Sequence, residues 1–188
     1  MLVFDKVRFS ILSNLIANLP ASYARHISVV LRYGEKHGDI RLRELAYRKL
    51  LKQAGTNIVI KPGTFIKEPE QISLGNNISI QEYCVLSGYG GLQIGNDVSI
   101  ATGCCVFSST HVYDNSDKKI RETELEKKAV TIGSNVWVGA GCKILGGVTI
   151  GNDVVIGAGS VVTRSLPDNG VYAGIPAKKI KSVHAMVD

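Results

Sequence analysis

The stretch from Ile132 to Ser165 reads IGSNVWVGAGCKILGGVTIGNDVVIGAGSVVTRS and repeats with a period of six residues. An aliphatic residue returns at every sixth position, namely at Ile132, Val138, Ile144, Ile150, Ile156 and Val162. A period of six fits neither the 3.6-residue turn of an α-helix nor the two-residue alternation of a strand with one buried face. It is typical of a hexapeptide β-helix, in which each repeat forms one face of a prism. The stretch therefore predicts a mainly β protein built as a solenoid.

The same aliphatic ladder continues toward the N-terminus, but its spacing changes at three places. Its earlier members are Ile60, Ile66, Leu74, Ile80, Leu86, Ile94, Ile100 and Val106. The steps are six residues except for two steps of eight and one of twenty-six, the last from Val106 to Ile132. If three repeats make one coil, every irregular step falls at the junction between two coils. The extra residues (68–70, 88–91 and 112–130) should therefore protrude from one corner, stacked about 4.8 Å apart, where a repeat scaffold often carries its function.

The charge of the chain is concentrated at its N-terminal end. Residues 1–56 hold 10 Lys and Arg against 4 Asp and Glu, a net charge of +6, whereas residues 57–188 hold 12 of each and are neutral. A neutral main body with few aromatic residues argues against a nucleic-acid groove. The domains expected are a helical segment (1–56), a β-helix (57–165) with an inserted loop at 112–130, and a C-terminal tail (166–188).

Two helices are expected in the N-terminal segment. Residues 1–19 are rich in apolar side chains up to Pro20, but they are too polar and too short to span a bilayer. Residues 40–53 carry leucines on one side, with Arg and Lys mostly on the other. One interpretation is a peripheral membrane helix at residues 1–19 that keeps the protein near a lipid-linked acceptor. The interpretation we favour is that these helices cover the open end of the solenoid or pack on a neighbouring subunit.

The four cysteines do not form a metal motif, because no Cys-x-x-Cys pair is present. Cys84, Cys104 and Cys142 each stand four positions after a ladder residue, where they should face inward as small apolar fillers. No secretory leader is apparent, so we expect a reducing, cytoplasmic compartment, at or near the inner face of a membrane if the N-terminal helix binds one.

His111 is the only histidine within the ladder, and it stands where the inserted loop leaves the solenoid. Histidine titrates near neutral pH and suits a general base, so His111 is the candidate catalytic residue. The inserted loop is polar and charge-dense, and long loops in compact repeats are commonly functional. Asp114, Glu122 or Glu124 of this loop are candidates to orient the imidazole, and the sequence does not choose among them.

Residues 57–183 resemble the left-handed β-helix acyltransferases, and most closely the branch of maltose and galactoside O-acetyltransferases and bacterial polysaccharide O-acetyltransferases. The matching motifs are ISLGNN, IGNDVSIATGCCVFSSTH, the run from Val130 to Pro167, and YAGIPAKKIK. The resemblance implies left-handed coils, a homotrimer, and acetyl-CoA as co-substrate in the cleft between adjacent prisms. It also implies that His111 removes the proton from the acceptor hydroxyl.

The resemblance assigns further residues to the site. Trp137 should wall the cleft near the acceptor and the pantetheine arm. The residues expected along the pantetheine are Gly139, Ala140, Gly157 and Ala158. Those expected at the final rung and around the phosphates of CoA are Thr163, Arg164, Lys178 and Lys181.

The acceptor end departs from the family pattern. Gln81 stands where sugar-specific relatives carry an asparagine, and Tyr89 stands where they carry an aspartate. Together with Trp137, the residues Gln81, Tyr83 and Tyr89 are therefore the candidate acceptor contacts. We expect O-acetylation of a sugar or polysaccharide precursor, with N-acetylation of an amino sugar or other amine as the alternative and a non-catalytic scaffold as a weaker one. A zinc enzyme on the same prism would need three histidine ligands, and the ladder supplies only one.

Overall fold

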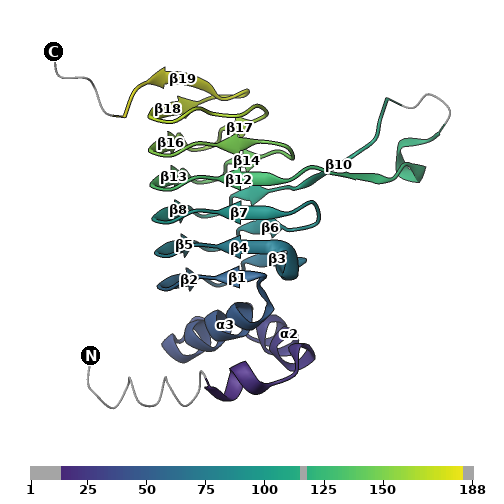
Figure 1. Cartoon of the computed structure of the whole chain (residues 1–188), viewed down its shortest axis with the longest axis vertical. Coiled ribbons are helices and arrows are strands. Elements are labelled where there is room, and N and C mark those ends of the chain that lie inside the picture. Colours follow the sequence, from purple (N-terminus) through teal and green to yellow (C-terminus); the bar gives the residue numbers. More distant parts are fainter. Residues whose placement is uncertain (1–13, 115–117, 184–188) are drawn as a thin grey trace.

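The computed structural model describes residues 14–114 and 118–183. It is a three-sided parallel β-helix that stands on a small group of helices, with one hairpin projecting from its side (Figure 1). Among the described residues, no helix is long and apolar enough to cross a membrane.

Three parallel sheets form the faces of the prism, and successive strands of the chain pass to successive faces. Sheet A contains β1 (Gln53–Ala54), β4 (Ile72–Leu74), β7 (Leu92–Ile94), β12 (Val130–Ile132) and β15 (Thr149–Ile150). Sheet B contains β2 (Ile58–Ile60), β5 (Ile78–Ile80), β8 (Val98–Ile100), β13 (Val136–Val138), β16 (Val154–Ile156), β18 (Gly170–Ala173) and the antiparallel β19 (Lys178–Lys181). Sheet C contains β3 (Phe65–Lys67), β6 (Val85–Ser87), β9 (Cys105–Val106), β14 (Lys143–Ile144) and β17 (Val161–Val162).

The aliphatic ladder forms the core, as the period of six predicted. Ile60, Ile80 and Ile100 are partners in adjacent strands of sheet B, and Val138 and Ile156 continue the same column. All five side chains are at most 1% exposed. Because each repeat turns one aliphatic side chain inward, stacking the coils buries a continuous apolar column that no single coil could bury alone.

The corner between sheets A and B is closed by a ladder of Asn and Asp side chains. Asn57 donates a hydrogen bond from Nδ2 to Oδ1 of Asn77 (3.0 Å), and Asn77 donates likewise to Asp97 (2.8 Å). Asn135 and Asp153 repeat the contact higher up at 2.7 Å. These residues have φ values of 53 to 57°, the left-handed region that Asn and Asp tolerate better than most residues. Each coil is thus tied to the next by side chains as well as by the sheet.

The corner between sheets B and C is closed from inside by a column of small polar side chains. As predicted, Cys84, Cys104 and Cys142 face inward and are fully buried. Each thiol donates to a carbonyl oxygen of the next coil, at 3.1 to 3.2 Å, and the hydroxyls of Thr64 and Ser160 extend the column at its two ends. The hydrogen bond with Cys142 lowers the pKa of Cys104, but the hydrogen bond with Cys84 and burial outweigh it and raise that pKa to about 11. The pKa of Cys142 is raised as well, by its hydrogen bond with Cys104 and by burial, whereas the hydrogen bond with Cys104 lowers the pKa of Cys84. The Cys104 thiol is therefore a protonated hydrogen-bond donor at neutral pH.

The N-terminal helices cover the lower end of the solenoid (Figure 1). Residues 14–18 are helical, and α2 (Ala21–Val30) and α3 (His37–Leu50) follow. α2 was not predicted, because its exposed apolar side chains give it no clear polar face. The region expected as a helix over 40–53 begins earlier and ends at Leu50, since Gln53 already pairs with sheet A in the first coil. Residues 1–13, most of the expected membrane helix, lie outside the described residues.

The position of Arg43 differs from the expectation that the basic side chains of the second helix lie mostly on its outer side. Its side chain is fully buried, because it closes the end of the prism. Nε donates to the carbonyl oxygen of Ile60 (3.0 Å), and Nη1 donates to those of Leu31 (2.6 Å) and Gly34 (3.1 Å). These bonds satisfy backbone oxygens of the first coil and of the α2–α3 connection, which the end of a solenoid otherwise leaves without partners.

Candidate active site

The corner between sheets C and A, here called the C–A corner, carries every irregular step of the ladder. From bottom to top it holds the 3-10 turn η1 (Pro69–Gln71), the turn 88–91, the inserted loop, the turn 145–148 and the turn 163–165. The other two corners keep a constant length through the regular coils. The prediction that the extra residues stack at one corner is confirmed.

The inserted loop begins and ends as an antiparallel hairpin rather than as an irregular flap. β10 (Ser109–His111) pairs with β11 (Leu125–Lys127), so that Ser109 faces Lys127 and His111 faces Leu125. A short 3-10 turn, η2 (Ile120–Glu122), lies toward the far end, well away from the prism (Figure 1). The hairpin holds His111 just outside the solenoid, at the third level of the C–A corner.

The side chain of His111 is exposed. In the described part of the chain, the imidazole has neither a hydrogen-bonding nor an ionic partner, so it is open to a substrate. None of the three candidate orienting acids contacts it. Across the strand, Glu124 accepts a backbone hydrogen bond from Val112 (3.3 Å), and Glu122 lies near Lys119 and Arg121 on the hairpin surface. The choice among the acids stays open.

Tyr89 lies one coil below His111, in a turn whose glycines allow close packing against the coils below and above it. A Cβ on Gly88 would lie 2.4 Å from the carbonyl oxygen of Glu68, and one on Gly90 would lie 2.0 Å from that of Ser108. The hydroxyl of Ser108 fixes the turn, because it donates to the carbonyl of Ser87 (2.7 Å) and accepts from the N–H of Gly90 (2.9 Å). These contacts join the Tyr89 turn to the root of the hairpin.

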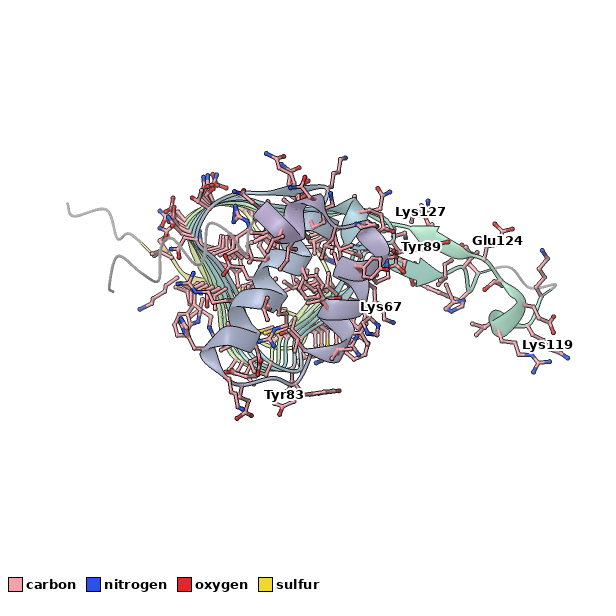
Figure 2. All side chains as sticks on the ribbon, turned by 90° about the horizontal axis from the view of Figure 1, so that it is seen from below. Lys67, Tyr83, Tyr89, Lys119, Glu124 and Lys127 are labelled. Carbon is pink, nitrogen blue, oxygen red and sulfur yellow. The ribbon has the colours of Figure 1, made fainter. Side chains whose placement is uncertain are left out.

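A lysine of the hairpin completes this cluster. Nζ of Lys127 lies 5.3 Å from the centroid of the Tyr89 ring, within the range of a cation–π contact. Sequence reasoning missed Lys127, because nothing in the inserted loop distinguishes it from the other lysines there. It also missed Lys67 beneath the same turn. Figure 2 shows Lys67, Tyr89 and Lys127 on one side of the prism, at the root of the hairpin.

The residues expected along the pantetheine lie at a different corner, between sheets B and C. Gly139 and Ala140 follow β13, and Gly157 and Ala158 follow β16 one coil higher. A side chain at Gly139 would collide with the backbone of Ala158, at 2.6 Å from its nitrogen. Gly141 and Gly159, next along the chain, have φ values of 72 and 71° and open space where a Cβ would stand. The result is a smooth surface of small residues two coils high.

The remaining expected residues are distributed over the prism. Trp137 stands on the outer face of sheet B, 56% exposed, between Ser99 and Val155. Thr163 and Arg164 are exposed at the top of the C–A corner, and Lys178 and Lys181 are exposed on β19 above sheet B.

Two candidate acceptor residues lie away from the C–A corner. Gln81 and Tyr83 both occupy the B–C corner in the second coil, and Figure 2 shows Tyr83 at a corner distant from Tyr89. Tyr83 has a φ of 59° at the position where neighbouring coils have Gly63 and Gly103, and its ring covers Gly63. Of the expected acceptor contacts, one chain therefore brings only Tyr89 near His111.

One chain consequently presents two half-sites. His111, Tyr89, Thr163 and Arg164 share the C–A corner, whereas Gly139, Ala140, Gly157 and Ala158 share the B–C corner. The whole width of sheet C separates the two groups.

Comparison with known proteins agrees with this architecture. Residues 129–164 match the family model "Bacterial transferase hexapeptide (six repeats)". A putative acetyltransferase of Saccharomyces cerevisiae is 35% identical over 77% of this chain and 73% of its own length. The crystal structure of a maltose O-acetyltransferase from Clostridium difficile 630 superposes with a TM-score of 0.75 at 28% identity, covering 87% of this chain and 86% of that one.

A second solved structure shares the fold. It is a hexapeptide-repeat acetyltransferase from Vibrio cholerae in complex with acetyl coenzyme A, with a TM-score of 0.77 at 24% identity over 87% of each chain. The left-handed parallel β-helix expected from the sequence is thus the fold of this protein. The chain belongs to the hexapeptide-repeat acetyltransferases.

Proposed function

We propose that this protein transfers the acetyl group of acetyl-CoA to a hydroxyl of a sugar or polysaccharide precursor, with His111 as the general base. The observation that carries the proposal is the position of His111. Its imidazole is exposed and has no hydrogen-bonding or ionic partner among the described residues, and it lies at the corner where a regular scaffold is interrupted by a hairpin. The similarity to a maltose O-acetyltransferase supports a sugar hydroxyl as the acceptor.

In this mechanism, His111 takes the proton of the acceptor hydroxyl as that oxygen attacks the thioester carbon. A hydroxyl is a poor nucleophile at neutral pH unless a base removes its proton in concert with the attack. The new C–O bond gives a tetrahedral oxyanion, which backbone N–H groups of the glycine-rich turns would stabilise. The C–S bond then breaks, and the proton held by His111 passes to the departing thiolate of CoA.

The binding of CoA is assigned to the surface of small residues and to the cationic tail. Gly139, Ala140, Gly157 and Ala158 leave room for an extended pantetheine beside the B–C corner, with Trp137 on the adjoining face. The phosphates of CoA would meet Arg164, Lys178 and Lys181, because ammonium and guanidinium groups form strong charge-assisted hydrogen bonds with phosphate. Thr163 adds a hydroxyl at the same level.

The two half-sites lead to the proposal of a homotrimer with shared active sites. The C–A corner of one chain would supply His111 and the acceptor contacts, and the B–C corner of its neighbour would supply the pantetheine surface. Co-expression of His111→Ala chains with Ala158→Trp chains tests this arrangement, because each variant alone should be inactive. Mixed trimers, isolated through two different tags, should recover part of the activity. Mixed trimers that stay inactive would place the whole site within one chain.

The reaction itself is tested by following free CoA thiol while the full chain is incubated with acetyl-CoA and single acceptors. Acceptor-dependent release with a neutral sugar, a uronic acid or a sugar phosphate, and an O-acetyl product by mass spectrometry, is the expected result. Release only with amino sugars would favour N-acetylation. Absence of acceptor-dependent release, together with absence of acetyl-CoA binding by calorimetry, would contradict the proposal.

A further inference from the structure

Lys127 lies beside the ring of Tyr89, and Lys67 lies one coil below the Tyr89 turn, at the same corner of the prism as His111. Lys127 belongs to the same hairpin as His111, where its backbone pairs with Ser109. Lys67 ends β3 one coil below Tyr89, and its carbonyl oxygen accepts the N–H of Gly88 in the Tyr89 turn (2.9 Å). Both lysine side chains are exposed, and they lie on the same side of the prism as Tyr89, at the root of the hairpin (Figure 2).

The charges of these two lysines are not neutralised by neighbouring acids. Glu70 is engaged by Arg25 (3.4 Å), and Glu126 is engaged by Lys128 (3.0 Å). Within the described ranges 14–114 and 118–183, neither Lys67 nor Lys127 has an acidic partner within 4.0 Å. The surface below His111 therefore carries two ammonium groups that a bound anion can neutralise.

A cavity immediately below this surface is lined by charged residues. It has a volume of about 250 Å³ and lies between α2 and β3, where Arg32, Lys67 and Glu68 are among its lining residues. Among the residues that the structure describes, Nε of Arg32 and Oε2 of Glu68 have no hydrogen-bond partner, and both atoms are buried beside the cavity rather than exposed in it. The Arg32 guanidinium stacks on the ring of Phe65, 3.6 Å from its centroid, which fixes its position. Orphaned buried polar atoms are rare in proteins, and this donor and this acceptor belong to two residues that line one cavity, a combination that suits a polyhydroxylated ligand once the side chains turn toward it.

We propose that the acceptor is an anionic saccharide whose carboxylate or phosphate binds Lys67 and Lys127, beside the face of Tyr89. The inference rests on the proposed function, in which His111 activates the hydroxyl. The Glu68 turn, the Tyr89 turn and His111 occupy successive coils about 4.8 Å apart, so a path of roughly 10 Å joins the cavity to the base. A saccharide of about two units would place one hydroxyl at His111, its anionic group between the lysines, and its far hydroxyls at Arg32 and Glu68.

The test compares three probes on the full chain: methyl glucoside, methyl glucuronide and glucose 1-phosphate. The first is neutral, the second carries a carboxylate, and the third carries a phosphate. The variants are the double substitution Lys67→Gln with Lys127→Gln, and Lys119→Gln as the matched control. Lys119 lies at the far end of the same hairpin, with 75% of its side chain exposed, so its substitution removes one positive charge, half of what the double variant removes, away from Tyr89 (Figure 2).

We expect at least one anionic probe to exceed the neutral one in kcat/KM by about tenfold, since a charge-assisted contact is worth about one such factor. The double variant should lose about tenfold to a hundredfold on that probe, mainly through KM, and stay within about twofold on methyl glucoside. Which of the two anionic probes responds identifies carboxylate or phosphate. Equal use of neutral and anionic probes, an unaffected double variant, or the same loss in Lys119→Gln would overturn the proposal.

A binding measurement keeps this inference separate from the proposed reaction. NMR titration of the three probes in the absence of acetyl-CoA should show binding of the anionic probe to the original protein and its loss in the double variant. If that holds but no probe is acetylated, the proposed function fails and the anionic site stands. If sugars are acetylated without discrimination by charge, the function stands and the anionic site is wrong. If no probe binds or reacts, both are wrong.

Discussion

Two corners of the prism, A–B and C–A, differ in length and in the side chains that they carry. The A–B corner is three residues long in each regular coil, from Gly55–Asn57 to Gly151–Asp153, and its Asn and Asp side chains bond one coil to the next. The C–A corner ranges from a short turn at 163–165 to the whole hairpin insertion, and it presents His111, Tyr89 and Lys127.

The difference shows what fixes the length of a solenoid corner. At the A–B corner, each turn must offer a left-handed residue and a side-chain amide or carboxylate at a constant height, so an inserted residue breaks bonds to two neighbours. A Cβ on Gly75 would also lie 2.4 Å from the carbonyl oxygen of Gly95, which leaves no room for change. At the C–A corner, the coils meet mainly through glycines and single hydroxyls, so extra residues can leave the prism. The proposed base, His111, lies at the corner that tolerates extra residues.

The largest effect expected at the C–A corner is on activity alone. His111→Ala should lower kcat by about 10²- to 10⁴-fold, the usual contribution of a general base. Because the side chain is exposed, the free energy of unfolding should change by less than about 0.5 kcal/mol. Thiol release and urea unfolding measure the two quantities, and calorimetry should show that acetyl-CoA still binds. Turnover at the original rate would remove His111 from the mechanism.

A matched pair of insertions tests the length argument directly. Two residues, Gly-Ser, inserted between Asn152 and Asp153 should destabilise the protein by about 2–4 kcal/mol, because several inter-coil hydrogen bonds are lost. The same insertion between Arg164 and Ser165, at the C–A corner, should cost about 1 kcal/mol or less, since lengthening a loop adds little entropy. Urea unfolding of both variants gives the comparison. Equal losses would mean that the two corners do not differ in tolerance.

Two variants of Asn77 separate the contributions of backbone conformation and of side-chain hydrogen bonds to the stability of the A–B corner. Asn77→Ala removes two side-chain hydrogen bonds and places alanine at a φ of 57°, so a loss of about 1–3 kcal/mol is expected. Asn77→Gly removes the same bonds but tolerates that φ, so its loss should be smaller by about 1 kcal/mol. Both variants should keep kcat in the thiol assay below their unfolding temperature. A glycine variant as unstable as the alanine variant would assign the whole effect to the hydrogen bonds.

The smallest effect expected is a pH dependence of the free energy of unfolding, which arises from Cys104 at the B–C corner. The pKa of Cys104 is raised from 9.0 to about 11 in the folded chain, so the folded state keeps this proton at pH values where the unfolded state loses it. Its stabilising contribution is complete below pH 9 and is lost as pH rises, by about 1.4 kcal/mol between pH 9 and pH 10 at most. Cys104→Ser, which keeps a donor to the carbonyl of Gly139, should therefore lose less stability than the original protein over that interval. Parallel curves from urea unfolding would show that the thiol does not titrate as described.

The sequence by itself determined the prism, its core and the level of the site. The ladder places one aliphatic residue inward in every six, and the burial of that residue stabilises each coil in the same way. The breaks in the ladder then located the C–A corner, with His111 at it, without knowledge of any contact. The A–B ladder was also visible in the recurring Gly-Asn-Asn, Gly-Asn-Asp and Gly-Ser-Asn triplets after the ladder residues, although it was not predicted.

Only the tertiary structure decided which non-repeating residues meet. Lys127 reaches Tyr89 because the hairpin returns antiparallel beside its own start, and the aperiodic loop sequence carries no signal for that register. Arg43 is buried because the end of a solenoid exposes carbonyl oxygens that its guanidinium group can bond. The amphipathic pattern of the helix carries no sign of these oxygens, and it therefore predicts an arginine on the outer side. The separation of His111 from Gly139 by sheet C likewise depends on the three-sided cross-section. That geometry divides the site between two corners, and the proposed trimer would rejoin them.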